Sequence, residues 1–388
     1  MRRFALLALI LASAACVRRP PVAVVPAPPS VGGLPPGSLK CDSLGYTQTV
    51  AIDPSNTSTL YAGSFGCGVF KSTNGGASWA AANSPITASS TVRTLAIDPS
   101  NPKVIYAGTA NGVFRSADGG GSWVESSAGL TGVIGGFAIS SPSIRALVLD
   151  RSSKPATIYA ETQVGVFKSS NEGAQWTWVN KGIRIKLAEG GVYQNTVGAL
   201  AIDPAHRKTL YAGTMDFGMG GGAVQSGVYK SSNRGKEWKI AVQGLNSTSV
   251  ISLAIDPSHP KTIYAGTSDG GIFKTTNGGD RWSAVSTGIP QDASTGKYPN
   301  SIYALVVDPA HPGNVYAATA GFRNGVNSLF VSRNAGESWT ASNGGLNGAV
   351  NWGLAVDPSN PATVYLATSN GVFKSTDSGA TWQPTGAQ

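Results

Sequence analysis

One phrase, close to Ala-Ile-Asp-Pro, occurs seven times along the 388-residue chain at intervals of 45 to 53 residues. After it, each copy carries an apolar-Tyr-Ala-like phrase, a Gly-Val-Phe-Lys-like phrase and a Ser-x-Asn/Asp-x-Gly-x-x-Trp-like phrase. A repeat of about 50 residues is one supersecondary unit that cannot bury its apolar residues alone. The units must therefore stack on one another. The phrase supplies seven repeat aspartates: Asp53, Asp98, Asp150, Asp203, Asp256, Asp308 and Asp357.

Every unit contains four short apolar or alternating stretches, named A to D in chain order, with turn residues between them. The Asp-Pro phrase suits an A–B turn because Pro fixes φ, and the Gly before the Trp permits positive φ in a C–D turn. With 50 glycines and only 13% charged residues, the composition favours strands and turns over helices. Four strands per unit form one propeller blade. We predict an all-β fold, a seven-bladed β-propeller of four-stranded antiparallel blades, over residues 41–388.

The Trp-containing phrase resembles the Asp-box, or BNR, repeat of the sialidase-like propeller superfamily. We expect its Asn or Asp to accept backbone N–H bonds within the C–D turn, and its Trp to pack between neighbouring blades. Two further tryptophans, Trp178 and Trp352, stand outside the repeat. The residues predicted to be structural are Asn74, Trp79, Asp118, Trp123, Asn171, Trp176, Asn233, Trp238, Asn277, Trp282, Asn334, Trp339, Asp377 and Trp382.

The repeat also accounts for residues that would otherwise suggest chemistry. His206, His259 and His311 each lie three residues after a repeat Asp, where other units carry Asn, so we predict A–B turn residues. No His remains for a catalytic base or a zinc site, and we expect no metal and no cofactor. The chain has no basic–aromatic cluster of the nucleic-acid type, so we expect no nucleic-acid partner.

A cation recurs at one position of stretch C. We expect solvated charges on packed stems; the alternative is a ring that attracts anionic lipid or an acidic partner. The sixth unit has Val331 at this position, and the other six have Lys71, Arg115, Lys168, Lys230, Lys274 and Lys374.

The N-terminus has a targeting pattern. Two arginines precede an apolar run from Phe4 to Ala15, which is shorter than the roughly 20 residues of a membrane-spanning helix. The run ends in Ser-Ala-Ala-Cys16, which resembles the lipobox of bacterial lipoproteins, with Ser13 in place of the usual Leu. We predict a lipoprotein signal peptide over 1–15, and lipidated Cys16 with a Pro-rich tether over 16–40. The alternative is a secreted protein cleaved nearby.

These features imply an extracytoplasmic protein anchored to a membrane by its N-terminal lipid, periplasmic or at the cell surface, with the outer membrane favoured. In an oxidising compartment the two remaining cysteines, Cys41 and Cys67, can form a disulfide. We favour this pairing over two inert thiols.

The units differ in length almost only in their B–C and D–A connections. An up-and-down blade places both kinds of connection on one side of the ring, called here the long-loop face. Insertions confined to one face mark a binding face. The alternative is that the side chains there plug the funnel of the ring. The predicted binding residues are Phe65, Phe137, Arg184, Lys186, Tyr193, Asp216, Phe217, Lys297, Tyr298, Phe322 and Arg323.

Two functions follow. The first is a lipid-anchored protein-binding or assembly scaffold, expected to be monomeric; the chain resembles single-propeller photosystem II stability/assembly factors. The second is a glycoside hydrolase acting on a polysaccharide, because the repeat wording is similar to that of xyloglucanase-type endoglucanases, which pair two carboxylates. Sialidase activity is not expected, since no Arg lies between Arg19 and Arg93. We favour the scaffold. The candidate acid and base are Glu161, Glu189, Asp216, Asp269 and Asp292.

Overall fold

The computed structural model describes residues 44–82, 84, 86, 90–134, 137–139, 142–183, 195–216, 226–247, 249–268, 271–291, 298, 300–320 and 328–386. All of these residues belong to one compact unit. Within the residues given above, all regular structure is β-strand. None of them forms a helix that is long and apolar enough to cross a membrane.

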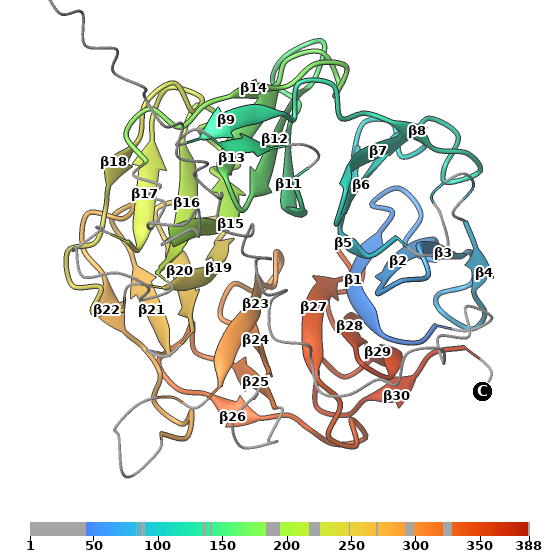
Figure 1. Ribbon diagram of the computed structural model, residues 1–388. Helices are drawn as coiled ribbons and strands as arrows, with labels where there is room; N and C mark the ends of the chain where they lie inside the picture. The colour runs from blue at the N-terminus through green and yellow to red at the C-terminus, as the bar shows by residue number, and fades with distance from the viewer. Residues whose placement is uncertain are drawn as a thin grey trace, which may run out of the picture. The chain divides into compact units, whose positions relative to one another are not determined.

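Seven four-stranded antiparallel sheets are arranged as the blades of a propeller, which confirms the predicted fold (Figure 1). The strands of blades one to three are β1 (Thr47–Ile52), β2 (Leu60–Ser64), β3 (Val69–Ser72) and β4 (Ala80–Ala81); β5 (Val92–Ile97), β6 (Ile105–Thr109), β7 (Gly112–Ser116) and β8 (Val124–Glu125); and β11 (Ile144–Asp150), β12 (Thr157–Thr162), β13 (Gly165–Ser169) and β14 (Thr177–Trp178).

Blades four to seven repeat the same order. Their strands are β15 (Asn195–Ile202), β16 (Leu210–Asp216), β17 (Val228–Ser231) and β18 (Lys239–Ile240); β19 (Val250–Ile255), β20 (Ile263–Thr267), β21 (Ile272–Thr275) and β22 (Ser283–Ala284); β23 (Ser301–Val307), β24 (Val315–Ala320), β25 (Leu329–Ser332) and β26 (Thr340–Ala341); and β27 (Asn351–Val356), β28 (Val364–Thr368), β29 (Gly371–Ser375) and β30 (Gln383–Pro384).

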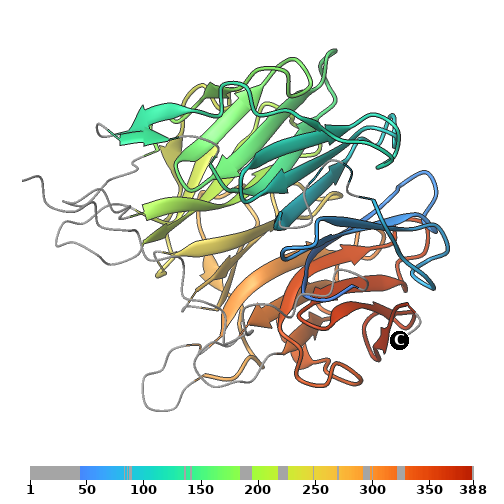
Figure 2. The ribbon, with the colours of Figure 1, turned by 45° about the vertical axis from the view of Figure 1, so that its right-hand side comes forward.

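One pair of strands stands outside the blades. β9 (Gly132–Ile134) and β10 (Phe137–Ile139) form a two-stranded hairpin in the D–A connection between the second and third blades. Figure 2 shows this hairpin projecting from one face of the ring. That face is the long-loop face, because the hairpin belongs to a D–A connection.

The first strand of every blade is the innermost, and successive inner strands contact one another around the ring (Figure 1). The last inner strand, β27, contacts β1, so the ring is closed. Each blade is built from four strands that are consecutive in the sequence. The first and last blades therefore have no strand in common that would join them. Hydrogen bonds join them instead: Trp79 Nε1 donates to Thr385 Oγ1 at 3.1 Å, and Gly386 N donates to Gly76 O at 2.8 Å.

Tryptophans of the C–D turns join each blade to the preceding one. Trp123 Nε1, for example, donates to Ala82 O of the first blade at 2.7 Å. Six of the seven side chains are at most 3% exposed, and Trp79 is half-buried. The predicted packing of these residues between blades is therefore observed. The other donors are Trp176, Trp238, Trp282 and Trp339 to carbonyls, and Trp79 and Trp382 to hydroxyls.

Tyrosines of the second strand make the reverse connection, to the following blade. Tyr61 Oη donates to Gly119 O, in the C–D turn of the second blade, at 2.9 Å. The same bond recurs in every blade. The other donors are Tyr106, Tyr159, Tyr211, Tyr264, Tyr316 and Tyr365.

Several strand C cations take part in these contacts, so the expectation of solvated charges is wrong for them. Lys71 Nζ donates to the carbonyl that accepts from Tyr61, at 2.8 Å. The equivalent lysines Lys230, Lys274 and Lys374 do the same. In the sixth blade, where Val331 replaces the cation, Arg333 donates to Ser378 O from two residues further along. Six cations also lie 5.3 to 6.0 Å from the ring centre of their own blade's tyrosine.

The turn residues behave as the sequence predicts. Asp203 Oδ1 accepts the backbone N–H groups of Ala205 and His206, and Oδ2 lies 3.2 Å from His206 Nδ1. His259 and His311 make the same contact with their own repeat aspartates. The histidines are thus A–B turn residues. In the C–D turn of the first blade, Asn74 Oδ1 accepts Ser78 N at 2.9 Å.

We predict that Trp282→Phe lowers the free energy of unfolding by about 2 kcal/mol, because it removes buried volume and leaves the Ala241 carbonyl without its indole donor. The control is Trp178→Phe, at a tryptophan that is 53% exposed on β14. Its cost should stay below about 1 kcal/mol. Urea denaturation followed by fluorescence measures both values. Equal costs would show that the inter-blade position carries no special weight.

Candidate binding site

Few of the predicted site residues fall in the part of the chain that the structure describes. Phe65 is 40% exposed after β2, Tyr298 packs against the core of the fifth and sixth blades, and Glu161 is buried on β12. The others lie outside it: Cys16, Cys41, Arg184, Lys186, Glu189, Tyr193, Phe217, Asp269, Asp292, Lys297, Phe322 and Arg323. Phe137 and Asp216 belong to β10 and β16, but their side chains are not described.

Cys67 is buried and disulfide-bonded. The predicted partner, Cys41, is not among the described residues, so the Cys41–Cys67 pairing stays a prediction.

Each innermost strand has a register irregularity directly after its first, second or third ladder pair. A bulge leaves its extra residue out of the ladder and re-aims the side chain. The bulged position lies near the end of the strand that adjoins the D–A connection, and hence on the long-loop side. Unlike the rest of the repeat it varies from blade to blade: Gln48, Arg93, Arg145, Gly198, Ile251, Tyr303 and Trp352.

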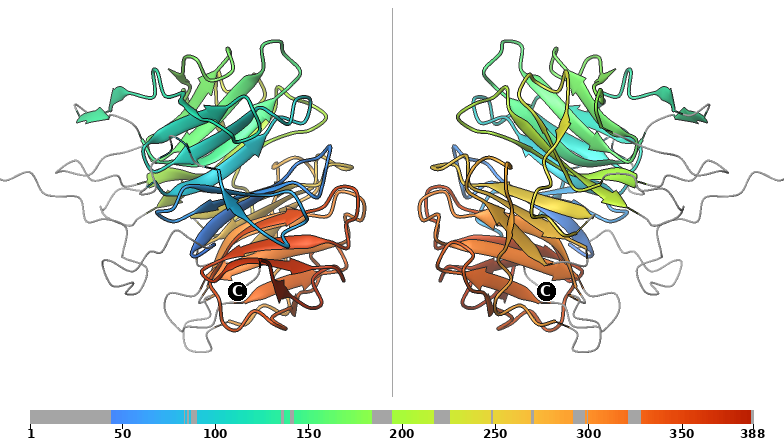
Figure 3. Two further views of the ribbon diagram at one scale, coloured as in Figure 1. Left: turned by 90° about the vertical axis from the view of Figure 1, so that its right-hand side faces the viewer. Right: turned by 90° about the vertical axis from the view of Figure 1, so that its left-hand side faces the viewer.

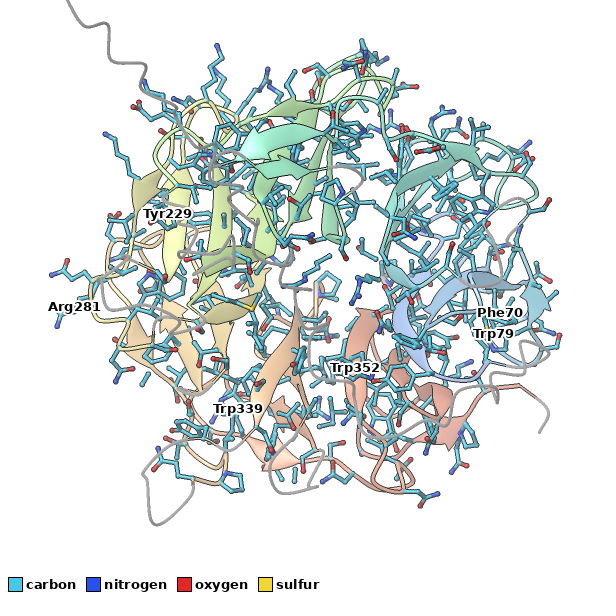
Figure 4. All side chains as sticks on the ribbon, in the orientation of Figure 1. Phe70, Trp79, Tyr229, Arg281, Trp339 and Trp352 are labelled. Carbon is cyan, nitrogen blue, oxygen red and sulfur yellow. The ribbon has the colours of Figure 1, made fainter. Side chains whose placement is uncertain are left out.

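Aromatic rings form a continuous arc on this side of the ring. Trp352 lies 5.0 Å from Tyr303 and 5.7 Å from Tyr46, and Tyr46 lies 5.5 Å from Phe65, measured between ring centres. The arc crosses the sixth, seventh and first blades, with Trp352 beside the centre of the ring (Figure 4). Tyr46, Tyr303 and Trp352 are half-buried. The arc is therefore an apolar platform that keeps part of each ring accessible.

Burial raises the pKa of Tyr46 and of Tyr303 above the usual value for a phenol. Both hydroxyls therefore keep their protons over the physiological pH range and are hydrogen-bond donors. The platform is polar at these two points without carrying charge.

Glu161 occupies a position where no other blade has a charged side chain. It follows the bulge in register, paired with Ala146, and the six equivalent residues are Gly63, Gly108, Gly213, Gly266, Ala318 and Ala367. At Gly63 an added Cβ would lie 2.6 Å from Val92 of the next blade. The repeat therefore favours a small residue here, and Glu161 departs from that rule. Such conflicts between a side chain and its fold concentrate at functional sites.

The buried carboxyl group of Glu161 is held mainly in its neutral form. Neither of its carboxyl oxygens has a hydrogen-bond partner among the described residues. Burial raises the pKa of Glu161 to about 8, although the positive charges of Arg145 and Arg93 act to lower it. The group is therefore mainly a neutral carboxylic acid at pH 7.

Arg93 and Arg145 occupy the bulges of the second and third blades. Burial and the like charge of Arg145 lower the pKa of Arg93, and the carboxyl of Glu161 opposes this shift. Arg93 Nε is buried without a hydrogen-bond partner in the described structure. The site thus combines two guanidinium groups, an unpartnered acid and an aromatic arc. We call Arg93, Arg145, Glu161, Tyr46, Phe65, Tyr303 and Trp352 the channel-mouth site.

The described side chains of the site are two cations, four aromatic rings and one carboxyl group. Three or more His, Cys, Asp or Glu side chains placed to hold a metal ion are not found within the described ranges. Of the five candidate catalytic carboxylates, only Glu161 has a described side chain, so the structure brings no predicted pair together. Sequence reasoning singled out Phe65 and Glu161 but missed Arg93, Arg145, Tyr46 and Tyr303. For Arg93, Arg145 and Tyr303, the signal in the sequence was that the residue at the bulged position varies from one repeat to the next.

No family model matches the chain. It is 27% identical over 194 residues to an oligoxyloglucan-reducing end-specific xyloglucanase of Emericella nidulans, covering 47% of this chain and 22% of that protein. It is 25% identical over 206 residues to a xyloglucanase of Hypocrea jecorina, covering 47% and 24%. The chain thus spans about a quarter or less of the length of these relatives.

Solved structures share the propeller fold. A GH74 xyloglucanase from Xanthomonas campestris matches 87% of this chain and 54% of its own, with a TM-score of 0.68 and 19% identity. YCF48 from Cyanidioschyzon merolae matches 86% and 96%, with a TM-score of 0.56 and 13% identity. YCF48 bound to D1 peptide matches 86% and 92%, with a TM-score of 0.57 and 11% identity. The chain is therefore similar in fold to both kinds of protein.

We predict that Glu161 makes the protein less stable as pH rises. The folded pKa of about 8 exceeds the ordinary value of 4.5, so the folded protein holds a proton that the unfolded chain releases. The contribution of Glu161 to the free energy of unfolding is largest below pH 4.5. It falls as pH rises to about 8, by on the order of 1 kcal/mol per pH unit. Glu161→Gln should remove this slope, measured by urea denaturation between pH 5 and 8.

Glu125→Gln, at an exposed glutamate on β8, is the matched control and should keep the slope. If Glu161→Gln leaves the pH dependence unchanged, Glu161 is not held neutral in the folded protein.

Proposed function

We propose that the protein is a lipid-anchored extracytoplasmic scaffold that binds a segment of another protein at the channel-mouth site. The observation that carries the proposal is the set of side chains on the inner strands and adjoining loops: four aromatic rings in contact, two bulged arginines and a buried glutamic acid without a partner. These residues interrupt a repeat that is otherwise nearly constant.

A peptide segment matches the chemistry of this site. Its carbonyl groups accept hydrogen bonds from arginine and from a protonated carboxyl group, and its side chains pack on aromatic faces. Trp, Tyr and Arg are also the residues that most often dominate the energy of protein interfaces. The fold neighbour YCF48 has been solved bound to D1 peptide, which supports peptide binding by a single propeller of this type.

The second candidate function is hydrolysis of a polysaccharide. The sequence similarity to xyloglucanases favours it. A glutamic acid whose pKa is raised to about 8 by burial is also a suitable general acid. Hydrolysis needs a second carboxyl group about 5 to 10 Å away. Glu189, Asp216, Asp269 and Asp292 are the candidates for that role.

We predict that Arg93→Ala/Arg145→Ala abolishes capture of the partner, because it removes both positive charges of the site. The lipidated full-length protein is used to pull down partners from native membranes. The control is Lys103→Ala/Arg281→Ala, which removes two exposed charges elsewhere; Arg281 lies at the periphery of the ring (Figure 4). Recovery should fall by on the order of tenfold or more for the first variant only, with melting temperature recorded for both.

A polysaccharide hydrolysis panel runs in parallel on the same preparations. Equal capture by both double variants contradicts the scaffold proposal. Turnover of a polysaccharide that disappears in Glu161→Gln would support the hydrolase instead.

The lipid anchor has its own test. Because only Cys16 can carry the predicted diacylglycerol, Cys16→Ser should move the protein from the membrane fraction to the soluble fraction on cell fractionation. Cys67→Ser serves as the control for cysteine replacement. Membrane association that survives Cys16→Ser would contradict the anchor.

A further inference from the structure

The side of the ring that carries the A–B turns has an apolar recess of about 420 Å³. It lies where the innermost strands of blades four to seven run into their A–B turns, so it faces away from the channel-mouth site. Ile202 and Ile255 are half-buried, and Pro257 and Pro309 are exposed. The volume is large enough for one or two bulky apolar side chains. The residues that form its floor and rim include Ile202, Pro204, Ile255, Pro257, Leu305 and Pro309.

The turns beside the recess are basic in two blades. The A–B turn of the fourth blade continues from Pro204 into His206-Arg207-Lys208, and that of the fifth contains His259 and Lys261. The corresponding turns of the first and seventh blades read Asn-Thr-Ser and Asn-Pro-Ala. Lys208 and Lys261 are exposed. The face that carries the A–B turns, called here the A–B face, therefore varies in charge from blade to blade.

Carboxylates in the same turns do not cancel these charges at the surface. Asp203 and Asp256 are buried, and their oxygens accept the backbone N–H groups and approach the histidine rings of their own turns. Their negative charge is therefore directed inward. Two exposed carboxylates of the C–D turns pair with other lysines: Glu237 lies 3.4 Å from Lys181, and Asp280 lies 3.9 Å from Lys230.

Positive charge also accumulates at the boundary of the third and fourth blades. The C–D turn that carries Arg234 and Lys236 is bonded to the basic A–B turn through Arg234 N and Lys208 O, at 2.9 Å. Burial lowers the pKa of Lys168, and the charges of Arg234 and Lys236 lower it further. The recess thus opens beside a cluster of cations that few carboxylates neutralise. Figure 3 shows the blades edge-on, with the strand ends that form the two faces.

We propose that the recess on the A–B face docks an acidic protein segment in which a bulky apolar side chain is flanked by carboxylates. The apolar side chain fills the recess between the ends of the inner strands, and the carboxylates meet Lys208 and Lys261. A flat anionic membrane matches this surface less well, because it could contact the cations but could not fill the recess. The site is independent of the channel-mouth site, so both can be occupied at once.

The test uses the full-length protein and a labelled peptide in which a central Leu-Trp pair lies between two Glu-Asp-Glu segments. Fluorescence anisotropy should detect binding below about 1 mM. Replacing Leu-Trp by Asn-Gln, or every acidic residue by Lys, should weaken binding by on the order of tenfold or more. These changes leave the protein untouched, so its folding cannot affect the result.

Protein variants locate the site. Lys208→Glu/Lys261→Glu should weaken binding of the acidic peptide by on the order of tenfold. The matched control is Lys103→Glu, because Lys103 follows Asn-Pro in the second blade as Lys261 follows His-Pro in the fifth, outside the recess. It should change binding by less than about twofold. Ile255→Gln, with its melting temperature recorded, tests the recess itself.

Several outcomes overturn the proposal. They are no binding of the Leu-Trp peptide, equal binding of the Asn-Gln peptide, and equal losses in the Lys103 and Lys208/Lys261 variants. Vesicles containing anionic phosphatidylglycerol are assayed in parallel. Binding to the vesicles but not to the peptide would assign the basic turns to a membrane surface.

Discussion

The ring is held together by one contact that recurs at every blade boundary: a tyrosine hydroxyl of one blade donates to a backbone carbonyl in the C–D turn of the next. In the first blade this is Tyr61 to Gly119 O. An indole N–H returns the connection from the later blade to the earlier one, as in Trp123 to Ala82 O. A buried backbone carbonyl without a hydrogen-bond donor is costly. Each blade therefore depends on a side chain of the adjacent blade to donate to its buried carbonyl. The same bonds close the ring between blades that share no strand.

This constraint decides where the molecule can vary. The second strand, the third strand and the C–D turn of a blade are committed to the contact, including cations such as Lys71 that bind the same carbonyl. Besides the B–C and D–A connections, two places are left free. One is the bulged position of the inner strand, which leaves the ladder and carries Arg93 in one blade and Trp352 in another. The other is the outer part of the A–B turn, beyond the Asp that caps it.

Much of the fold could be predicted from the sequence because the same strand and turn motifs recur in seven units. The position of His206 after a repeat Asp was enough to assign it to a turn, and the structure agrees. The channel-mouth site could not be found this way. Arg93 and Arg145 come together because β5 and β11 are neighbouring inner strands and each has a one-residue register shift, and neither fact is visible in the spacing. The cation of stretch C was misjudged for a related reason. Its partner carbonyl belongs to the next unit along the chain.

Glu161 shows how a repeat fold can gain a function at small cost. The equivalent residues in the other blades are Gly or Ala. At the glycines a Cβ would lie too close to a side chain of the next inner strand, so a larger side chain at this position opposes good packing. Burial also keeps the carboxyl group neutral, which avoids the cost of an isolated buried charge. The six unmodified boundaries supply the stability that this one gives up. A sevenfold repeat can therefore tolerate one polar boundary, and Glu161 is the side chain that departs from the repeat there.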